Sequence, residues 1–198
     1  AFTRDGVPLN DRTGNWLAAA NLGTVLPLAG DEGSALRVLT PVRDAEGRAV
    51  LVSARVDKSA AAAMPLPLTP RRVADVGASL MGQPYGWGGL NGDRDCSAML
   101  RDLFTPFGVW LPRNSAAQAR SGRFVDLTGG TPAARESRIL AEGRPFATLL
   151  WLPGHIGLYV GEYQGQAAFF HNLWGLRTRD ENGREGRHVL GRAVITST

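Results

Sequence analysis

A single cysteine and three histidines are the residues of this chain best suited to nucleophilic chemistry. Cys96 follows a glycine-rich segment and begins a stretch whose apolar residues recur at helical spacing. A sulfur atom at the start of a helix lies near the positive end of the helix dipole and near free backbone N–H groups, and both lower the pKa of a thiol. The position therefore favours a nucleophile, although a lone cysteine is more often a small buried apolar residue.

A cysteine nucleophile needs a base, and the base needs a third group that orients it. His155 opens an apolar stretch directly after a Pro-Gly pair, and His171 closes the next apolar stretch along the chain. Neighbouring antiparallel strands can place two such side chains on one face of a sheet, where one imidazole accepts the thiol proton and the other fixes its tautomer. His188 lies in a polar segment rich in glycine and arginine and is expected at the surface.

Other interpretations of these residues stay open at this point. A histidine beside a strand is often a structural group, and one cysteine with three histidines also suggests zinc. The local spacings of the usual zinc sites are absent, and the glycine-rich segment 82–92 lacks the GxxxxGK[ST] pattern of a phosphate loop. We therefore expect a Cys–His site that needs no metal and no cofactor.

Two helices are predicted on either side of the glycine-rich segment. Helical spacing over 71–81 predicts the first, with Thr69 as its N-cap. The second begins near Cys96, where Asp93 and Asp95 precede it and can cap its free N–H groups. The apolar face of this second helix is formed by Met99, Leu100, Leu103 and Phe104.

Four strands are predicted after the helices, over 148–152, 155–160, 167–171 and 189–196. The first two meet at the Pro-Gly pair, and the second and third are joined by a glycine-bounded turn over 161–165. Helices followed by an antiparallel sheet make this part of the chain an α+β fold.

Residues 1–60 contain short apolar runs separated by turn signals. Runs over 15–20, 24–28 and 36–42 are predicted strands, and the last pairs with the β-rich run that follows it in a hairpin. Closely spaced short strands without helices are typical of a small barrel.

The alanine- and proline-rich residues 61–70 predict a linker, with a short helix stopped by proline as the alternative. The expected organisation is a small β domain over 1–60, a linker over 61–70 and an α+β domain over 71–198.

Composition excludes several other classes of protein. The 22 basic and 18 acidic residues are scattered and leave a mild charge of +4, so no nucleic-acid groove is predicted. No run of about 18 apolar residues exists, so no transmembrane segment is predicted. The chain starts at Ala1 rather than at a methionine, and we expect a processed or truncated form.

Four separated motifs occur in an order that is specific in combination. They are Tyr85-Gly86-Trp87-Gly88-Gly89, Asp95-Cys96-Ser97, Leu111-Pro112-Arg113 with Ser115 and Gln118, and the stretch Leu152 to Gly161. Residues 70–196 thereby resemble the NlpC-type peptidoglycan peptidases, which are papain-like cysteine peptidases of the bacterial cell wall. By strand pattern alone, the first 60 residues resemble the SH3-like bacterial barrels that often precede such domains.

The resemblance implies a role for each matching residue. Cys96 matches the nucleophile, His155 the general base, and His171 the polar third member that orients the base. Residues implied to hold the oxyanion or bind substrate are Tyr85, Trp87, Asp95 and Ser97. In relatives that trim wall peptides with a free N-terminal L-alanine, residues matching Asp95 and Ser97 help bind the amine. Two departures from the family pattern are Ala98, where glycine is common, and the stretch 147–150, where Gly-Asp-Leu is common.

The function implied by the resemblance is hydrolysis of peptidoglycan stem peptides and muropeptides, as a γ-D-glutamyl-L-diamino acid endopeptidase. A monomer is expected, in the bacterial cell envelope or in the cytoplasmic recycling of wall peptides. Two alternatives stay open: an amidase or acyltransferase that uses the same Cys–His site, and a non-catalytic module that binds the cell wall.

Overall fold

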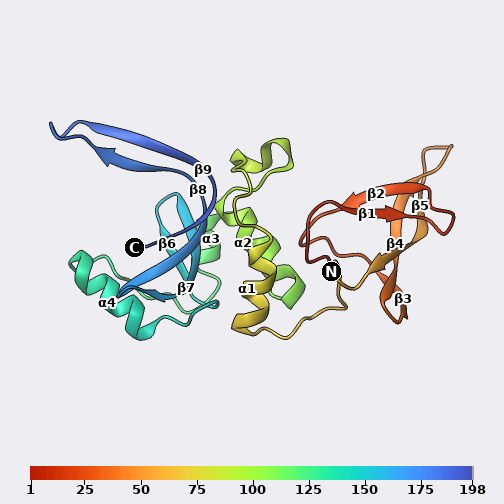
Figure 1. The fold of residues 1–198 in the computed structure, drawn as a ribbon, viewed down its shortest axis with the longest axis horizontal. Helices are drawn as coiled ribbons and strands as arrows, with labels where there is room; N and C mark the ends of the chain where they lie inside the picture. The colour runs from red at the N-terminus through yellow and green to blue at the C-terminus, as the bar shows by residue number, and fades with distance from the viewer. Residues whose placement is uncertain (198) are drawn as a thin grey trace. The chain divides into compact units, whose positions relative to one another are not determined.

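The computed structural model describes residues 1–197 (Figure 1) and divides into two compact units. One unit comprises Ala1–Leu68 together with Asp102–Trp110, and the other comprises Thr69–Arg101 together with Leu111–Thr198. The second unit contains every residue to which the sequence assigns a chemical role.

The first unit is built on an antiparallel sheet of five strands in the order β2-β1-β5-β4-β3. The strands are β1 (Val7–Asn10), β2 (Trp16–Ala20), β3 (Leu28–Glu32), β4 (Ala35–Arg43) and β5 (Ala49–Asp57). The predicted hairpin is confirmed, because β4 pairs with β5 along its whole length, from Ala35 opposite Asp57 to Arg43 opposite Ala49.

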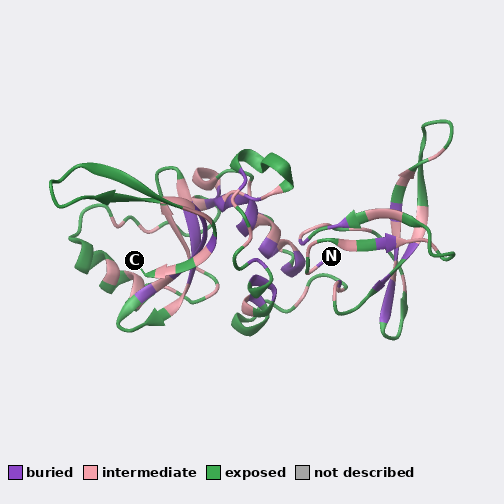
Figure 2. Cartoon of the chain, turned by 45° about the horizontal axis from the view of Figure 1, so that its top comes forward, coloured by how far each residue is buried: buried purple, intermediate pink, exposed green. Residues whose placement is uncertain are grey.

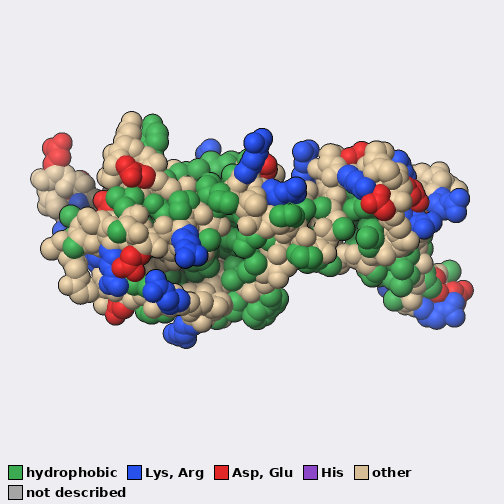
Figure 3. Space-filling view, turned by 90° about the horizontal axis from the view of Figure 1, so that it is seen from below, with side chains coloured by type: hydrophobic (Ala, Val, Ile, Leu, Met, Phe, Trp, Pro, Cys, Tyr) green, Lys and Arg blue, Asp and Glu red, His purple; other side chains and the backbone are tan. Residues whose placement is uncertain are grey.

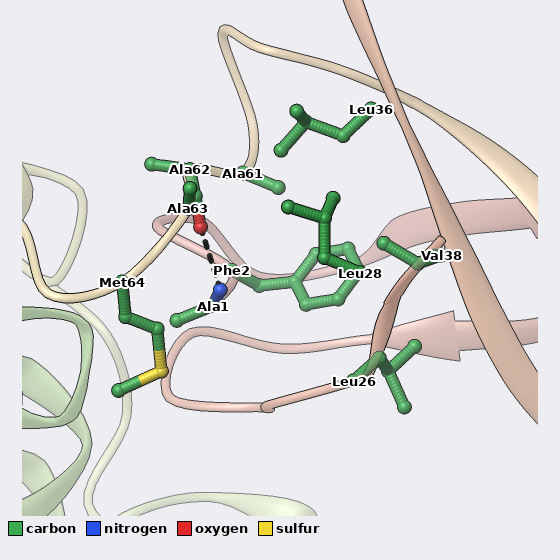
Figure 4. A pocket seen from close by; sticks show the side chains of 10 residues that line it. All are labelled: Ala1, Phe2, Leu26, Leu28, Leu36, Val38, Ala61, Ala62, Ala63 and Met64. Carbon is green, nitrogen blue, oxygen red and sulfur yellow. Dashed lines mark hydrogen bonds between the residues drawn. The ribbon is translucent and has the colours of Figure 1, made fainter. Parts of the chain in front are cut away.

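A small apolar core lies against this sheet. Its larger members, each at most 5% exposed, are Phe2, Leu9, Leu36, Val38 and Val56. Beside the core lies a cavity of about 180 Å³, around which Figure 4 shows Leu26, Leu28, Leu36 and Val38 facing the ring of Phe2. The ten residues that line the cavity carry no ionisable side chain, and the N-terminal amine of Ala1 among them donates to the carbonyl of Ala62 at 2.7 Å.

The structure differs from the predicted strands of this unit at two places. Residues 24–27 form no strand, and β3 begins only at Leu28. Pro27 has no N–H to donate to a neighbouring strand, and its carbonyl instead accepts from the N–H of Leu39. Strand β1 was not predicted, because Pro8 interrupts its short apolar pattern.

The helices are α1 (Pro70–Ala78), α2 (Cys96–Phe104), α3 (Ser115–Ala119) and α4 (Pro132–Glu142), with a 3₁₀ segment η1 (Trp87–Gly92) between the first two. All lie in the second unit except the end of α2 from Asp102 onward, which belongs to the first. A further 3₁₀ turn, η2 (Thr105–Phe107), follows α2. As predicted, the Thr69 side chain caps α1 by accepting from the N–H of Arg72. The predicted apolar face of α2 is confirmed, since its four residues are between 0% and 5% exposed.

Helices α3 and α4 were not predicted from the sequence. Helix α3 has only five residues, which is too short to show a helical period. Helix α4 buries none of its side chains fully, and its large apolar residues, Ile139 and Leu140, are only partly buried. Its cap was nevertheless visible in the sequence as a threonine followed by a proline, Thr131 and Pro132.

An antiparallel sheet in the order β6-β7-β8-β9 completes the second unit, so the α+β prediction is confirmed. Its strands are β6 (Leu149–Leu152), β7 (His155–Tyr163), β8 (Gln166–Arg179) and β9 (Glu185–Ser197). Strand β8 is largely buried from Ala167 to Leu173, and the outer parts of β8 and β9 extend as an exposed two-stranded ribbon (Figures 1 and 2).

This ribbon is longer than the sequence predicts. His188 lies in β9 opposite Leu176, not in a loop, although its side chain is exposed as expected. Arg177 and Arg179 form ion pairs with Glu185 across the ribbon, at 3.6 and 3.1 Å. Because the ribbon is exposed on both faces, it lacks the alternation of apolar and polar residues from which strands are predicted.

The charged side chains are spread over the surface. On the face shown in Figure 3, basic and acidic groups are interspersed, without a continuous basic groove. This distribution agrees with the mild net charge of +4.

A glycine allows β7 and β8 to approach closely beside the predicted histidine pair. A Cβ atom at Gly157 would lie 2.5 Å from the Phe169 ring, 2.7 Å from Cβ of His171 and 2.7 Å from the carbonyl oxygen of Phe170. Any larger residue at this position must push the two strands apart.

We therefore expect Gly157→Ala to lower the free energy of unfolding by about 1–3 kcal/mol, the usual cost of overpacking a tight site. Urea unfolding would measure the change. Gly129→Ala is the matched control, because a Cβ atom there meets open space. Equal stability of the two variants would show that β7 and β8 have room that the structure does not show.

Candidate active site

The predicted nucleophile lies at the first position of helix α2. Cys96 is 5% exposed. Asp95 caps the helix: its carbonyl accepts from the N–H of Met99 at 3.0 Å, and its carboxylate accepts from the N–H of Ala98 at 2.8 Å. Of the two predicted capping residues, only Asp95 therefore has this role, while Asp93 ends the 3₁₀ segment η1.

The capping carboxylate is itself held in place by an arginine. Arg113 donates to both oxygens of Asp95, at 3.0 and 2.7 Å, and the Ser97 hydroxyl donates to the same carboxylate at 3.0 Å. Burial works against the negative charge, but the bonds from Arg113, Ala98 and Ser97 outweigh it and keep the pKa of Asp95 below its ordinary value. Asp95 is therefore a fixed anion beside the sulfur.

A buried glutamine connects the same helix start to the segment that carries Arg113. The side-chain nitrogen of Gln118 donates to the carbonyls of Ser97 and Pro112, each at 2.8 Å. Gln118 is 2% exposed and lies on α3. Arg113 and Gln118 thus support the start of α2 through these hydrogen bonds.

Two opposing effects act on the pKa of the Cys96 thiol. Burial is the larger and raises the pKa of Cys96, and the negative charge of Asp95 acts in the same direction. The backbone N–H groups of Ile156, Ser97 and Cys96 itself point toward the sulfur and lower the pKa by a smaller amount. The sequence-based expectation of a lowered thiol pKa is therefore wrong, because it considered the helix terminus without the burial.

The two predicted histidines meet on neighbouring strands. Nε2 of His155, on β7, lies 2.8 Å from Nδ1 of His171, on β8. The other ring nitrogen of His171 lies 3.1 Å from the hydroxyl of Thr196, on β9. The structure thus joins three adjacent strands through one row of hydrogen bonds, of which the sequence predicted the first.

Both imidazoles are neutral at neutral pH. Burial lowers the pKa of His155 below its ordinary value. Burial and the neighbouring His155 lower the pKa of His171 to about 3. Since the thiol pKa is raised, the resting state combines a protonated thiol with neutral imidazoles and contains no thiolate–imidazolium ion pair.

The sulfur and the histidine pair are brought to the same place by β7. The N–H that points at the Cys96 sulfur belongs to Ile156, the residue directly after His155. Strand β7 therefore passes the sulfur at the position where the predicted base begins the strand.

Three aromatic rings gather beside the helix start. The ring centres of Tyr85 and Trp87 are 5.0 Å apart, and Trp174, on β8, lies 6.0 and 5.9 Å from them. Burial, followed by the charges of Cys96 and Asp95, raises the pKa of Tyr85 to about 12. Tyr85 therefore keeps its hydroxyl proton, and Trp87, which is 58% exposed, presents an indole surface to solvent.

Sequence reasoning did not identify Trp174, Asn172 or Thr196. Asn172 is 1% exposed and donates to the carbonyls of Arg94 and Pro84, which fixes the segment carrying Tyr85 against β8. Each of these three residues is a common strand residue with no motif around it. Only the strand register brings them to the site.

Within residues 1–197, no group of three or more histidine, cysteine, aspartate and glutamate side chains could hold a metal ion. The same residues include no helix long and apolar enough to cross a membrane.

Comparison with known families matches both parts of the chain. The profile of the NlpC/P60 family matches residues 82–184, and an SH3 domain of SH3b2 type matches residues 1–31. The first match contains Cys96, His155 and His171, and it ends before Thr196.

Two curated relatives match the second part of the chain. The γ-D-glutamyl-L-lysine dipeptidyl-peptidase of Bacillus subtilis is 32% identical over 94 residues, which are 47% of this chain and 30% of the relative. A probable endopeptidase of Corynebacterium glutamicum is 32% identical over 113 residues, 55% of this chain and 47% of the relative. The chain thus spans less than half the length of either relative.

Two solved structures match almost the whole chain. An NlpC/P60 endopeptidase from Photobacterium damselae subsp. piscicida has a TM-score of 0.76 and 30% identity over 98% of this chain and 45% of its own. An NlpC/P60 family protein from Bacillus cereus has a TM-score of 0.60 at 19% identity over 99% of this chain and 56% of its own, and it supports the fold alone.

The raised thiol pKa predicts slow alkylation of the resting protein. Because Cys96 is the only cysteine, iodoacetamide labels a single thiol. We expect its rate to rise only above the pH at which a free cysteine ionises, since burial disfavours the thiolate. Mass spectrometry of labelled protein across pH, with N-acetylcysteine in parallel, measures this. Labelling faster than the free thiol at pH 6 would instead indicate a thiolate–imidazolium pair.

The lowered histidine pKa predicts a loss of stability in acid. Unfolding releases His171 to an ordinary value near 6.5, whereas the folded value is about 3, so only the unfolded chain binds this proton at intermediate pH. Stability should therefore fall as the pH drops from 6.5 toward 3, by an amount on the order of a few kcal/mol. Urea unfolding at pH 7 and pH 4.5 measures it.

In the same measurement, His171→Asn should remove this share of the pH dependence, because asparagine does not titrate. His188→Asn is the control, since that side chain is exposed. If both variants kept the wild-type slope, another group would be responsible for the acid sensitivity.

Proposed function

Because the chain belongs to the NlpC/P60 family, we propose that it is a cysteine peptidase that cleaves the peptides of bacterial peptidoglycan. The observation that carries the proposal is the meeting of Cys96, at the start of α2, with the first residues of β7, where His155 is hydrogen-bonded to His171. A nucleophile, a base and a group that orients the base are the parts that such a reaction requires.

The reaction starts from the neutral pair. As the sulfur of Cys96 attacks the peptide carbonyl, its proton passes to His155, whose Nε2 is held by His171 and whose Nδ1 is the nitrogen left for the thiol. Removing the proton during the attack suits a buried thiol, because a free thiolate would be costly there.

The tetrahedral intermediate carries a negative oxygen that needs hydrogen-bond donors. The N–H of Cys96 is unpaired within the helix because it lies at the first position, and the Tyr85 hydroxyl stays protonated. Both are proposed to donate to the oxyanion. His155 then gives its proton to the leaving amine, and water releases the acyl group from the sulfur by the same steps in reverse.

We propose that the scissile bond joins γ-D-glutamate to a diamino acid. The matching relative from Bacillus subtilis is named for a γ-D-glutamyl-L-lysine peptidase activity. Asp95 and Ser97 are the polar groups nearest Cys96 along the chain and are proposed to bind a free N-terminal amine. Since Arg113 already pairs with Asp95, a bound amine would share that carboxylate with the guanidinium.

The exposed indole of Trp87 is proposed to line the same pocket, with Trp174 packed beside it. The match of residues 1–31 to an SH3 domain supports action at the cell envelope, and recycling of wall peptides in the cytoplasm is the alternative. No cofactor is needed for these steps, and the protein is proposed to act as a monomer.

The test is a digest of L-Ala-γ-D-Glu-meso-diaminopimelate followed by mass spectrometry. The wild-type chain should release diaminopimelate, and Cys96→Ala or His155→Ala should each lower the rate by at least about a thousand-fold. His188→Ala, which changes an exposed histidine, should keep the wild-type rate. Turnover by Cys96→Ala at the wild-type rate would overturn the mechanism.

The same digest with an N-acetylated peptide and with a glycan-linked muropeptide separates the substrates. Loss of cleavage on acetylation supports recognition of the amine, whereas equal rates would remove that role from Asp95 and Ser97. Release of a different product, such as one cut at the sugar–peptide amide, would favour the amidase. Binding to wall fragments without any product would favour the non-catalytic module.

A further inference from the structure

The hydrogen bonds of the site do not end at His171. The hydroxyl of Thr196, on β9, lies 3.1 Å from Nε2 of His171, whose Nδ1 is bonded to His155 at 2.8 Å. We propose that the Thr196 hydroxyl accepts a hydrogen bond from Nε2–H of His171, and that Thr196 is thereby a positioning residue for the tautomers that leave Nδ1 of His155 free to accept the thiol proton. This inference rests on the proposed function of Cys96 and His155.

A row of two neutral imidazoles has two possible proton arrangements. In the first, Nε2–H of His155 donates to Nδ1 of His171, and Nε2–H of His171 donates to the Thr196 hydroxyl. In the second, the Thr196 hydroxyl donates to Nε2 of His171, Nδ1–H of His171 donates to Nε2 of His155, and His155 carries its proton on Nδ1. Only the first leaves a lone pair on Nδ1 of His155, which a base for the thiol requires.

Because His171 is buried, the hydrogen-bond partner at its Nε2 determines which tautomers are possible. His171 is 3% exposed, so an N–H on its Nε2 needs a partner within the protein. The Thr196 oxygen is the partner found at that nitrogen in the structure. Because the pKa of His171 is about 3, its ring carries only one proton at neutral pH, either on Nδ1 or on Nε2.

The position of Thr196 suits this role. In the sheet, Thr196 pairs with Phe169, two residues before His171 on β8, so the hydroxyl reaches the ring diagonally across two strands. The side chain is half-buried, while those of Ile195 and Ser197 beside it are exposed. Successive strand residues point to opposite faces, so neither neighbour can replace the hydroxyl.

Removal of the Thr196 hydroxyl should favour the second proton arrangement over the first. With valine at 196, an Nε2–H on His171 would be a buried donor without a partner, which is costly. The proton is better placed on Nδ1 of His171, where it can donate to Nε2 of His155. His155 then carries its own proton on Nδ1, facing the thiol, and cannot accept another.

The experiment compares Thr196→Val, which keeps the branched shape, with Thr196→Ser, which restores the hydroxyl. Ser197→Ala is the matched control on the same strand. We expect Thr196→Val to lower kcat by about ten-fold or more with KM unchanged, because the residue acts on the proton and not on substrate binding. Thr196→Ser and Ser197→Ala should stay close to the wild type.

A second readout needs no substrate. Nitrogen-15 NMR of labelled histidine distinguishes protonated from unprotonated ring nitrogens, so it reports each tautomer directly. In the wild type, both site histidines should carry the proton on Nε2, and in Thr196→Val on Nδ1. This readout tests the role of Thr196 even if the wild-type chain cleaves no wall peptide, which separates its failure from that of the proposed function.

Unchanged histidine tautomers in Thr196→Val would overturn the inference, as would equal loss of kcat in the valine and serine variants. Thermal unfolding of all variants identifies a loss due to instability, because the tautomers of a folded variant remain measurable at a lower temperature.

Discussion

The site depends on one short hydrogen bond between two buried imidazoles. His155 and His171 approach to 2.8 Å only because Gly157, on the same strand as His155, leaves no side chain between β7 and β8. Two charged rings could not be held so closely in a buried position, so at most one ring can be charged, and burial favours the neutral form of both at rest. The sheet thereby sets the protonation state of the base before any substrate arrives.

Burial also disfavours the charged form of the nucleophile, Cys96. Burial keeps the proton on Cys96, and the fixed anion Asp95 next to it adds to the effect. The helix terminus and the N–H of Ile156 act against burial but do not overcome it. Such a site holds no thiolate–imidazolium pair at rest and relies on hydrogen-bonding groups that are already oriented when the attack begins. The direction of each hydrogen bond is therefore as important as its length.

Much of this arrangement could be predicted from the sequence, and the remainder depends on register. Helical spacing and a preceding aspartate identified Cys96 and its cap, and a Pro-Gly turn located His155. The ribbon beyond His171 was missed because it is exposed on both faces, and Thr196 because a threonine in a strand is ordinary. The thiol pKa was predicted in the wrong direction, since burial is a property of the fold that no local motif reports.

The hairpin of β8 and β9 has an inner part that positions site residues and an outer part that forms the exposed ribbon. A register shift between Leu173 and Gly175 divides the buried part, which carries His171 and Thr196, from the exposed part. The tip at residues 180–184 is closed by its own bonds, in which Asp180 accepts from the N–H groups of Asn182 and Arg184. The tip can therefore be lengthened, shortened or labelled, for example with a dye or an affinity tag, without changing the register of the inner strand pairs.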